Sequence, residues 1–166
     1  MRIVVLTNND MTGNAVFSPL FEMDNVQVAA VFFSAGLTNN ATGPISSAFT
    51  LRKRMDTRYW WFLVVTNGLF YLFSALTSLL NLSPKCGIFR SIEACARQLE
   101  VPLIHASNFN DLETKNKIRS LNPDLLLIRI STVLDEEVLS IPSLGTWCVH
   151  SSLLPAYGGI AGEFQA

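Results

Sequence analysis

The residues best suited to chemistry lie near the end of the chain, around His150. The short apolar stretch at residues 146–149 predicts a β-strand, and His150 follows that strand directly. A histidine with a pKa near neutrality can donate a hydrogen bond to an oxyanion or relay a proton. Nucleophilic attack on a carbonyl group calls for both, because the attack creates a tetrahedral oxyanion and releases a proton. His150 is therefore the first candidate for a catalytic group.

Cys148 lies two residues before His150, so the two side chains project from the same face of the predicted strand. Such side chains are about 6–7 Å apart along a strand, too far for the hydrogen bond of a Cys–His nucleophile pair. A small buried cysteine is the preferred interpretation. The three cysteines are an odd set without C-x-x-C spacing, which argues against a disulfide framework or a zinc site. They favour a reducing compartment, and so a cytoplasmic protein.

Short apolar segments alternate with helical patterns along the chain. Strands are expected at residues 2–6, 26–33, 101–104, 125–128 and 146–149. Helices are expected near residues 17–23, 88–100 and 112–121, with a short one beginning at the acidic residues 135–137. This alternation predicts an α/β fold, a Rossmann-like parallel sheet with flanking helices. Ligands of such sheets lie beyond the carboxyl ends of the strands, here just after Leu6, Phe33, Ile130 and Val149.

Residues 37–86 interrupt this rhythm. Residues 37–50 are rich in Thr, Asn, Gly and Ser and predict a loop, and a basic cluster follows between Arg52 and Arg58. Residues 59–82 then carry no charge at all. That length suffices for a membrane span, and aromatic residues beside a basic cluster also suit a membrane interface.

An apolar helix inserted into the domain is the favoured interpretation of residues 59–82. Asn67, Ser74, Ser78 and Asn81 fall on one side of such a helix as a polar stripe. A true span would also have to divide the sheet across its middle. The helix is expected to cover the sheet, a partner protein or a membrane surface.

The overall composition is compatible with this interpretation. Of the 166 residues, 49% are hydrophobic and 15% charged, and the formal net charge is −1. Such a balance excludes a disordered chain and lacks the basic surplus typical of nucleic-acid-binding proteins.

The stretch from Gly145 to Gly159 resembles the signature G-x-x-N-x-H-x-S-L-L-P-x-Y/F-x-G of the folate-dependent formyltransferases. The matching residues are Gly145, His150, Ser152, Leu153, Leu154, Pro155, Tyr157 and Gly159. The lead-in 122–126, Asn-Pro-Asp-Leu-Leu, and the segment 139–142, Leu-Ser-Ile-Pro, also resemble the pattern of that family. The resemblance is specific from about Pro123 to Gly159 and is limited to the strand–helix rhythm before it.

The resemblance implies a formyltransferase-like N-terminal catalytic domain spanning residues 1–166 and incomplete at its C-terminus. It implies 10-formyltetrahydrofolate as the formyl donor, His150 as the catalytic residue, and no metal. The substrate- and cofactor-binding positions it implies are Cys148, Ser152, Leu153, Pro155, Tyr157 and Gly159. Two departures bear on activity. Cys148 stands where the family has an Asn, and the aspartate that tunes the histidine in the family lies beyond Ala166.

Three hypotheses follow. In the first, the chain is the N-terminal part of an enzyme that transfers a formyl group to a sugar amine or another small amine, with tRNA disfavoured by the low basic content. In the second, it is a catalytically inactive protein that binds a membrane or a partner through residues 59–82. In the third, it is a shortened product with no activity of its own.

Overall fold

A parallel sheet forms the centre of the protein. The computed structural model describes residues 1–8, 11–34, 52, 56–80 and 90–150. Within them the strands are β1 (Arg2–Thr7), β2 (Gln27–Ser34), β3 (Leu103–Ala106), β4 (Leu125–Arg129) and β5 (Thr146–Cys148). They pair in the order β3-β2-β1-β4-β5, and every pair is parallel. The predicted α/β fold with a Rossmann-like parallel sheet is confirmed.

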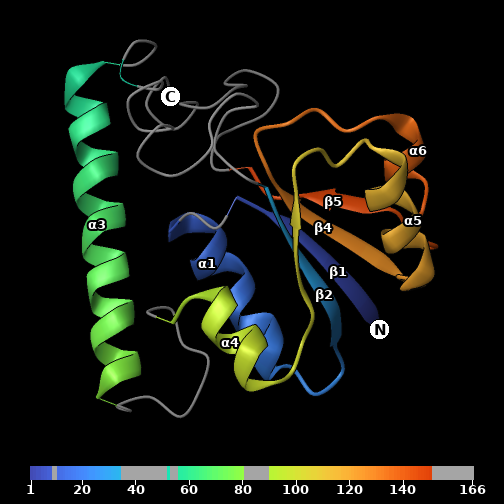
Figure 1. The fold of residues 1–166 in the computed structure, drawn as a ribbon, viewed down its shortest axis with the longest axis horizontal. Helices are drawn as coiled ribbons and strands as arrows, with labels where there is room; N and C mark the ends of the chain where they lie inside the picture. The colour runs from blue at the N-terminus through green and yellow to red at the C-terminus, as the bar shows by residue number, and fades with distance from the viewer. Residues whose placement is uncertain (9–10, 35–51, 53–55, 81–89, 151–166) are drawn as a thin grey trace.

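Helices lie on both faces of this sheet (Figure 1). The described helices are α1 (Met11–Phe17), the 3₁₀ helix η1 (Ser18–Glu22), α3 (Thr57–Leu79), α4 (Ile92–Gln98), α5 (Leu112–Ser120) and α6 (Glu136–Leu139). Phe17 of α1 and Ile92 of α4 belong to the core on one face, and Ile118 of α5 and Val138 of α6 to the core on the other. Most boundaries lie within a few residues of those expected. The helix expected at residues 17–23 is almost entirely the 3₁₀ helix η1, and the helix α1 precedes it.

The strands at the centre of the sheet are apolar along almost their whole length because both of their faces are covered. In β1, Ile3 and Val5 pack on the α1 and α4 side, whereas Val4 and Leu6 pack on the α5 and α6 side. All four side chains are buried, as parallel strands between two helical layers require.

Asp124 fastens the start of β4 to the start of β1. Its carboxylate Oδ2 accepts a hydrogen bond from the Arg2 backbone N–H at 2.6 Å, and its own N–H donates to the Arg2 carbonyl at 2.8 Å. The preceding Asn122 adopts a positive φ of 46°, which ends α5 in the left-handed conformation that asparagine tolerates well. The segment 122–126 therefore has a structural role in setting the register of β4.

The expected apolar insertion is the helix α3. It lies outside α1, on the side of α1 away from the sheet, and contacts α1 (Figure 1). The expectation that it covers the sheet is therefore wrong: α1 and α4 already occupy that face. Of the expected polar stripe, Asn67 and Ser74 are turned toward the domain, where they accept hydrogen bonds from the backbone N–H groups of Met11 and Ser91.

Lys115 of α5 pairs with two carboxylates at the start of α6. Its Nζ lies 2.6 Å from Asp135 Oδ2 and 2.6 Å from Glu137 Oε2, and its side chain is only 9% exposed. The hydrogen bond from Lys115 is the main cause that holds the pKa of both carboxyls below its usual value. The backbone N–H of Val138 adds to this at Asp135, and Arg119 adds to it at Glu137. This cluster fixes α6 against α5.

We expect Lys115→Met to lower the midpoint of urea unfolding at pH 7. Because the carboxyl pKa values are depressed in the folded state, the stabilisation is complete above the unfolded-state values of about 4 and is lost as the pH falls through the lower folded-state values. The difference in midpoint between the two proteins should therefore be smaller at pH 3 than at pH 7. Lys117→Met is the matched control on the same helix, since the Lys117–Glu113 pair is exposed and should contribute little.

Asn14 connects α1 with α4 inside the protein. Its fully buried side chain accepts a hydrogen bond from the Ile92 backbone N–H at 2.6 Å through Oδ1. We expect Asn14→Ala to lower the free energy of unfolding by about 1–3 kcal/mol, because a buried N–H is left without its acceptor. Chemical denaturation measures this effect. The exposed Asn116→Ala on α5 should change the free energy by less than about 0.5 kcal/mol, and an equal loss in both variants would contradict the assignment.

Candidate active site

The carboxyl ends of the strands bring together residues that are distant in the sequence. β1 is the branch point of the sheet: the chain runs from β1 to β2 and β3 on one side, and β4 and β5 lie on the other. The crevice at such a topological switch point is where ligands of open parallel sheets bind. Here it lies between the ends of β1 and β4, with the end of β5 beside it.

Asn8 and Ser131 meet at this switch point. The Asn8 backbone N–H donates to the Arg129 carbonyl at 3.2 Å, which continues the β1–β4 pairing past the strand end. The Asn8 amide nitrogen donates to Ser131 Oγ at 2.9 Å. The Asn8 amide oxygen is buried and has no hydrogen-bond partner in the structure. An unpaired acceptor of this kind costs about 1–3 kcal/mol.

The sequence predicts only that the turn after β1 lies at the ligand end of the sheet. The available signal was that Asn8 and Ser131 each closely follow an apolar strand. Their direct contact could not be foreseen, because it depends on β1 and β4 being neighbours in space although 123 residues separate the two side chains.

β5 carries the predicted catalytic position. Val149 N–H donates to the Ile128 carbonyl at 2.9 Å, so the pairing with β4 extends to the residue before His150. His150 is half-buried and follows immediately. The structure therefore places His150 at the carboxyl end of a parallel strand, as predicted. Strand spacing puts the ends of β1 and β5, on either side of β4, about 10 Å apart.

Cys148 is exposed, and the prediction of a buried cysteine is wrong. The reason is the place of β5 in the sheet: it is an edge strand among the described residues, with β4 as its one neighbour. The strand is correspondingly open, and Trp147 on its other face is 65% exposed. The Cys148 thiol lies 3.9 Å from the Val149 carbonyl oxygen, a weak contact at most.

The remaining predicted binding positions, Ser152, Leu153, Pro155, Tyr157 and Gly159, lie outside the described residues. Within the part of the chain that the structure describes, no three His, Cys, Asp or Glu side chains are grouped so that they could hold a metal ion.

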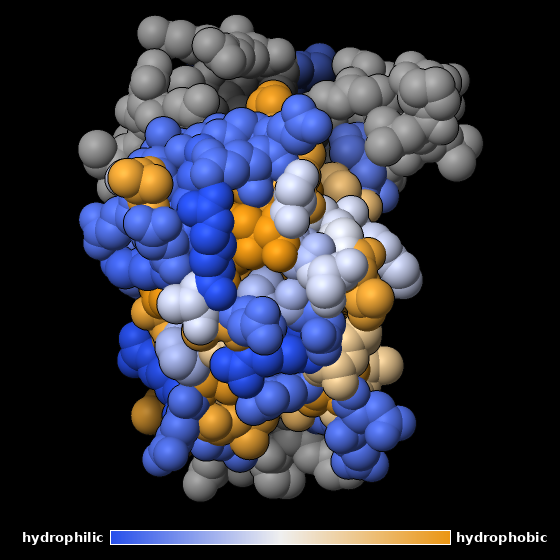
Figure 2. All heavy atoms as spheres, turned by 90° about the vertical axis from the view of Figure 1, so that its right-hand side faces the viewer, coloured by the Kyte–Doolittle hydropathy of each residue, from blue (hydrophilic) through white to orange (hydrophobic). Residues whose placement is uncertain are grey.

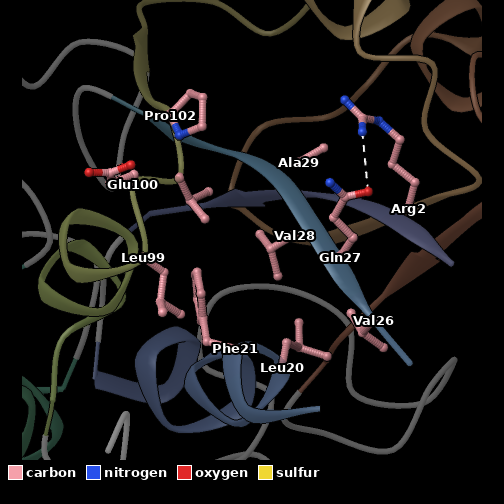
Figure 3. Close-up of a pocket in the computed structure, with 11 residues that line it drawn as sticks. Arg2, Leu20, Phe21, Val26, Gln27, Val28, Ala29, Leu99, Glu100 and Pro102 are labelled. Atoms are coloured by element: carbon pink, nitrogen blue, oxygen red, sulfur yellow. Dashed lines mark hydrogen bonds between the residues drawn. The ribbon is translucent and has the colours of Figure 1, made fainter. Parts of the chain in front are cut away.

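Two surface depressions are found at the other end of the sheet. The first is shown in Figure 3 and is lined by Arg2, Leu20, Phe21, Val26, Gln27, Val28, Ala29, Leu99, Glu100, Val101 and Pro102. The Arg2 guanidinium there already donates to Gln27 Oε1 at 3.3 Å and to the Leu121 carbonyl at 2.5 Å. The second depression adjoins Asn122 and Pro123, just before β4. Both lie at the amino ends of strands, away from His150, so neither is part of the candidate site.

The placement of Cys148 predicts its reactivity. In a Cys86→Ser background, which removes the cysteine outside the described residues, we expect one thiol to react rapidly with a disulfide reagent in the folded protein. A second thiol, the buried Cys95, should react only after denaturation. Spectroscopic titration of released thiolate measures both phases. Cys148→Ser should remove the fast phase, and a fast phase that survives this substitution would contradict the edge position of β5.

Part of the chain is similar in sequence to known proteins. No model of a known protein family matches the chain. Methionyl-tRNA formyltransferase of Thermotoga maritima is 39% identical over 69 residues, which are 41% of this chain and 22% of that protein. The enzyme of the same name from Clostridioides difficile is 38% identical over 71 residues, 42% of this chain and 23% of its own length.

A third relative is the bifunctional polymyxin resistance protein ArnA of Wigglesworthia glossinidia brevipalpis. It is 29% identical over 91 residues, 54% of this chain and 14% of that protein. The chain thus spans less than a quarter of the length of each of these three relatives.

Proposed function

This chain is related in sequence to formyltransferases, and we propose that it contributes to transfer of a formyl group from 10-formyltetrahydrofolate to an amine. The observation that carries the proposal is the position of His150. It follows a parallel strand at the ligand end of the sheet, beside the switch point between β1 and β4.

The chemistry requires few groups. The amine nitrogen attacks the formyl carbon, and the carbonyl electron pair moves to the oxygen to form a tetrahedral oxyanion. The oxyanion then re-forms the carbonyl, the bond to the folate nitrogen breaks, and the proton lost by the amine reaches the leaving nitrogen. In the proposed role, His150 donates a hydrogen bond to the oxyanion and relays this proton.

The polar pair at the switch point supports an amine as the acceptor. Asn8 Oδ1 is a buried hydrogen-bond acceptor without a donor, and an amine N–H is a suitable donor for it. A separation of about 10 Å between the ends of β1 and β5 leaves room for a substrate that reaches from Asn8 to the reacting carbon near His150.

The acceptor we propose is a sugar amine or another small amine. The chain has 12 basic and 13 acidic residues, so it offers no general attraction to the phosphates of a tRNA. The name of the two formyltransferases above points instead to an aminoacylated tRNA, which is the alternative acceptor for the assay. We propose a cytoplasmic location for this activity, in keeping with unpaired cysteines.

The proposed site departs from the formyltransferase pattern at Cys148. In the formyltransferases that the chain resembles, the position equivalent to Cys148 holds an asparagine whose amide binds the formyl oxygen. A thiol is a poor donor and cannot replace two amide N–H groups. We therefore expect formyl transfer by this chain to be slow, because Cys148 does not supply the hydrogen bonds that would stabilise the oxyanion.

This account predicts that Cys148→Asn raises the rate of formyl transfer, by up to about 10²-fold, the effect of one well-placed oxyanion donor. The assay follows amine-dependent formation of tetrahydrofolate from 10-formyltetrahydrofolate, with an aminosugar nucleotide and methionyl-tRNA as separate acceptors. Trp147→Asn is the matched control: it places the same amide on the opposite face of the same exposed strand and should leave the rate unchanged.

His150→Ala should abolish whatever transfer is measured in either background, while leaving the far-ultraviolet circular dichroism spectrum unchanged. Absence of folate binding by equilibrium dialysis, together with no gain from Cys148→Asn, would overturn the proposed function and favour a protein without catalytic activity.

A further inference from the structure

The outward side of α3 is a continuous apolar surface. Ten large hydrophobic side chains on or just after this helix are 41–81% exposed. Tyr71 lies apart from the others, and the remaining nine are Trp61, Phe62, Val65, Leu69, Leu72, Phe73, Leu76, Leu79 and Leu80. At 3.6 residues per turn, all nine fall within a sector of about 120°. We call these nine residues the α3 stripe.

The opposite side of α3 is held by the domain. Tyr59, Phe70 and Ser74 are buried, and Asn67 and Ser74 accept the hydrogen bonds from Met11 and Ser91. The orientation differs from that of an ordinary amphipathic surface helix, since Asn67 and Ser74 face the protein whereas the nine stripe residues face the surroundings. Hydrophilic side chains cover much of the face of the molecule that carries α5 and α6 (Figure 2).

A contiguous group of nine exposed large hydrophobic side chains marks a site of interaction. We propose that the α3 stripe docks onto an anionic lipid bilayer, with α3 lying in the plane of the membrane–water interface. Its 23 residues would extend about 34 Å along that plane.

The charges around α3 favour anionic lipid as the partner. The segment 52–58 contains four basic residues and one acidic residue, and the exposed Arg58 falls within the same sector as the stripe. Trp61, one of the nine stripe residues, lies at the same end of the helix, whereas the Arg52–Trp60 contact falls on the opposite side of α3 and is not counted among the charges that face the lipid. No acidic residue occurs between Asp56 and Glu93. Arginine and tryptophan beside an apolar helix face are typical of helices at the lipid headgroup level.

Pairing with a second copy of the chain is less well supported by the same charges. In a parallel α3 pair the two Arg58 side chains would face each other. In an antiparallel pair each would face the Leu79 and Leu80 end of the partner helix. Neither arrangement gives Arg58 an acidic partner from α3, whereas lipid phosphates do.

Length and composition alone would also allow α3 to cross a membrane. However, 11% of its most apolar segment is buried in the protein, and this buried part holds the helix to the domain. A spanning helix would have to give up the contacts with Met11 and Ser91 and move Asn67 and Ser74 into lipid. An in-plane position keeps them all.

The test is flotation of the full chain with vesicles of phosphatidylcholine and phosphatidylglycerol at a ratio of 7:3. We expect binding that weakens at least tenfold in Leu69→Asp/Phe73→Asp, because two charges enter the apolar surface. The matched control Leu112→Asp/Val133→Asp adds the same charges at side chains that are 68% and 86% exposed on other elements, and should bind as the unmodified chain does. Leu79→Asp changes a single, 81% exposed side chain, so it should weaken flotation without disturbing the fold.

Arg58→Gln should weaken binding to the anionic vesicles several-fold. Vesicles of phosphatidylcholine alone should bind several-fold less of the unmodified chain. High salt with alkaline carbonate should release the bound protein, as expected for a peripheral helix.

Three outcomes would overturn the proposal. The first is no flotation of the unmodified chain, and the second is equal loss in the stripe and control variants. The third is resistance to carbonate, which would indicate a membrane-spanning helix. Sedimentation velocity without lipid tests the remaining alternative: a dimer that the stripe substitutions dissociate, combined with absent flotation, would assign the stripe to a second copy of this chain.

Discussion

The pairing of β1 with β2 on one side and with β4 on the other is the constraint on which the structure depends. It joins the start of the chain to a segment more than 120 residues later, through parallel registers on both edges of one strand. Because both faces of β1 are buried as well, helices must cover the sheet on each side. The same pairing brings Asn8 next to Ser131 and so creates the polar switch point at the carboxyl end of the sheet.

The opposite ends of the sheet have different physical roles. At the amino ends, Asp124 satisfies the backbone of Arg2 and the Arg2 side chain is engaged with Gln27 and Leu121, so these polar groups hold the register of the strands. At the carboxyl ends, Asn8 retains an unpaired buried oxygen beside the end of β4. A buried acceptor without a donor lowers stability, and hydrogen bonds and packing elsewhere in the fold offset this loss.

The helix α3 and the strand β5, which lies at the edge of the described sheet, both expose side chains that are usually buried. β5 exposes Trp147 and Cys148, and α3 exposes its stripe. In β5 the exposure leaves the predicted formyl-binding position accessible. In α3 it follows from geometry. Because α1 and α4 fill the sheet face, α3 contacts the domain from outside, through the one side that carries Tyr59, Phe70, Asn67 and Ser74.

The sequence by itself determined the class of fold, most element positions and the candidate His150, because hydrophobic periodicity and the 145–159 signature are local patterns. It also identified α3 as an apolar helix with a polar stripe. Only the tertiary structure decided that Asn67 and Ser74 face the domain, that Cys148 is exposed and that Asn8 meets Ser131. Each of these depends on which elements are neighbours in space: α3 outside α1, β5 at the edge, and β1 beside β4. Strand order and layer order arise from long-range pairing and competition for buried surface, which local periodicity does not encode.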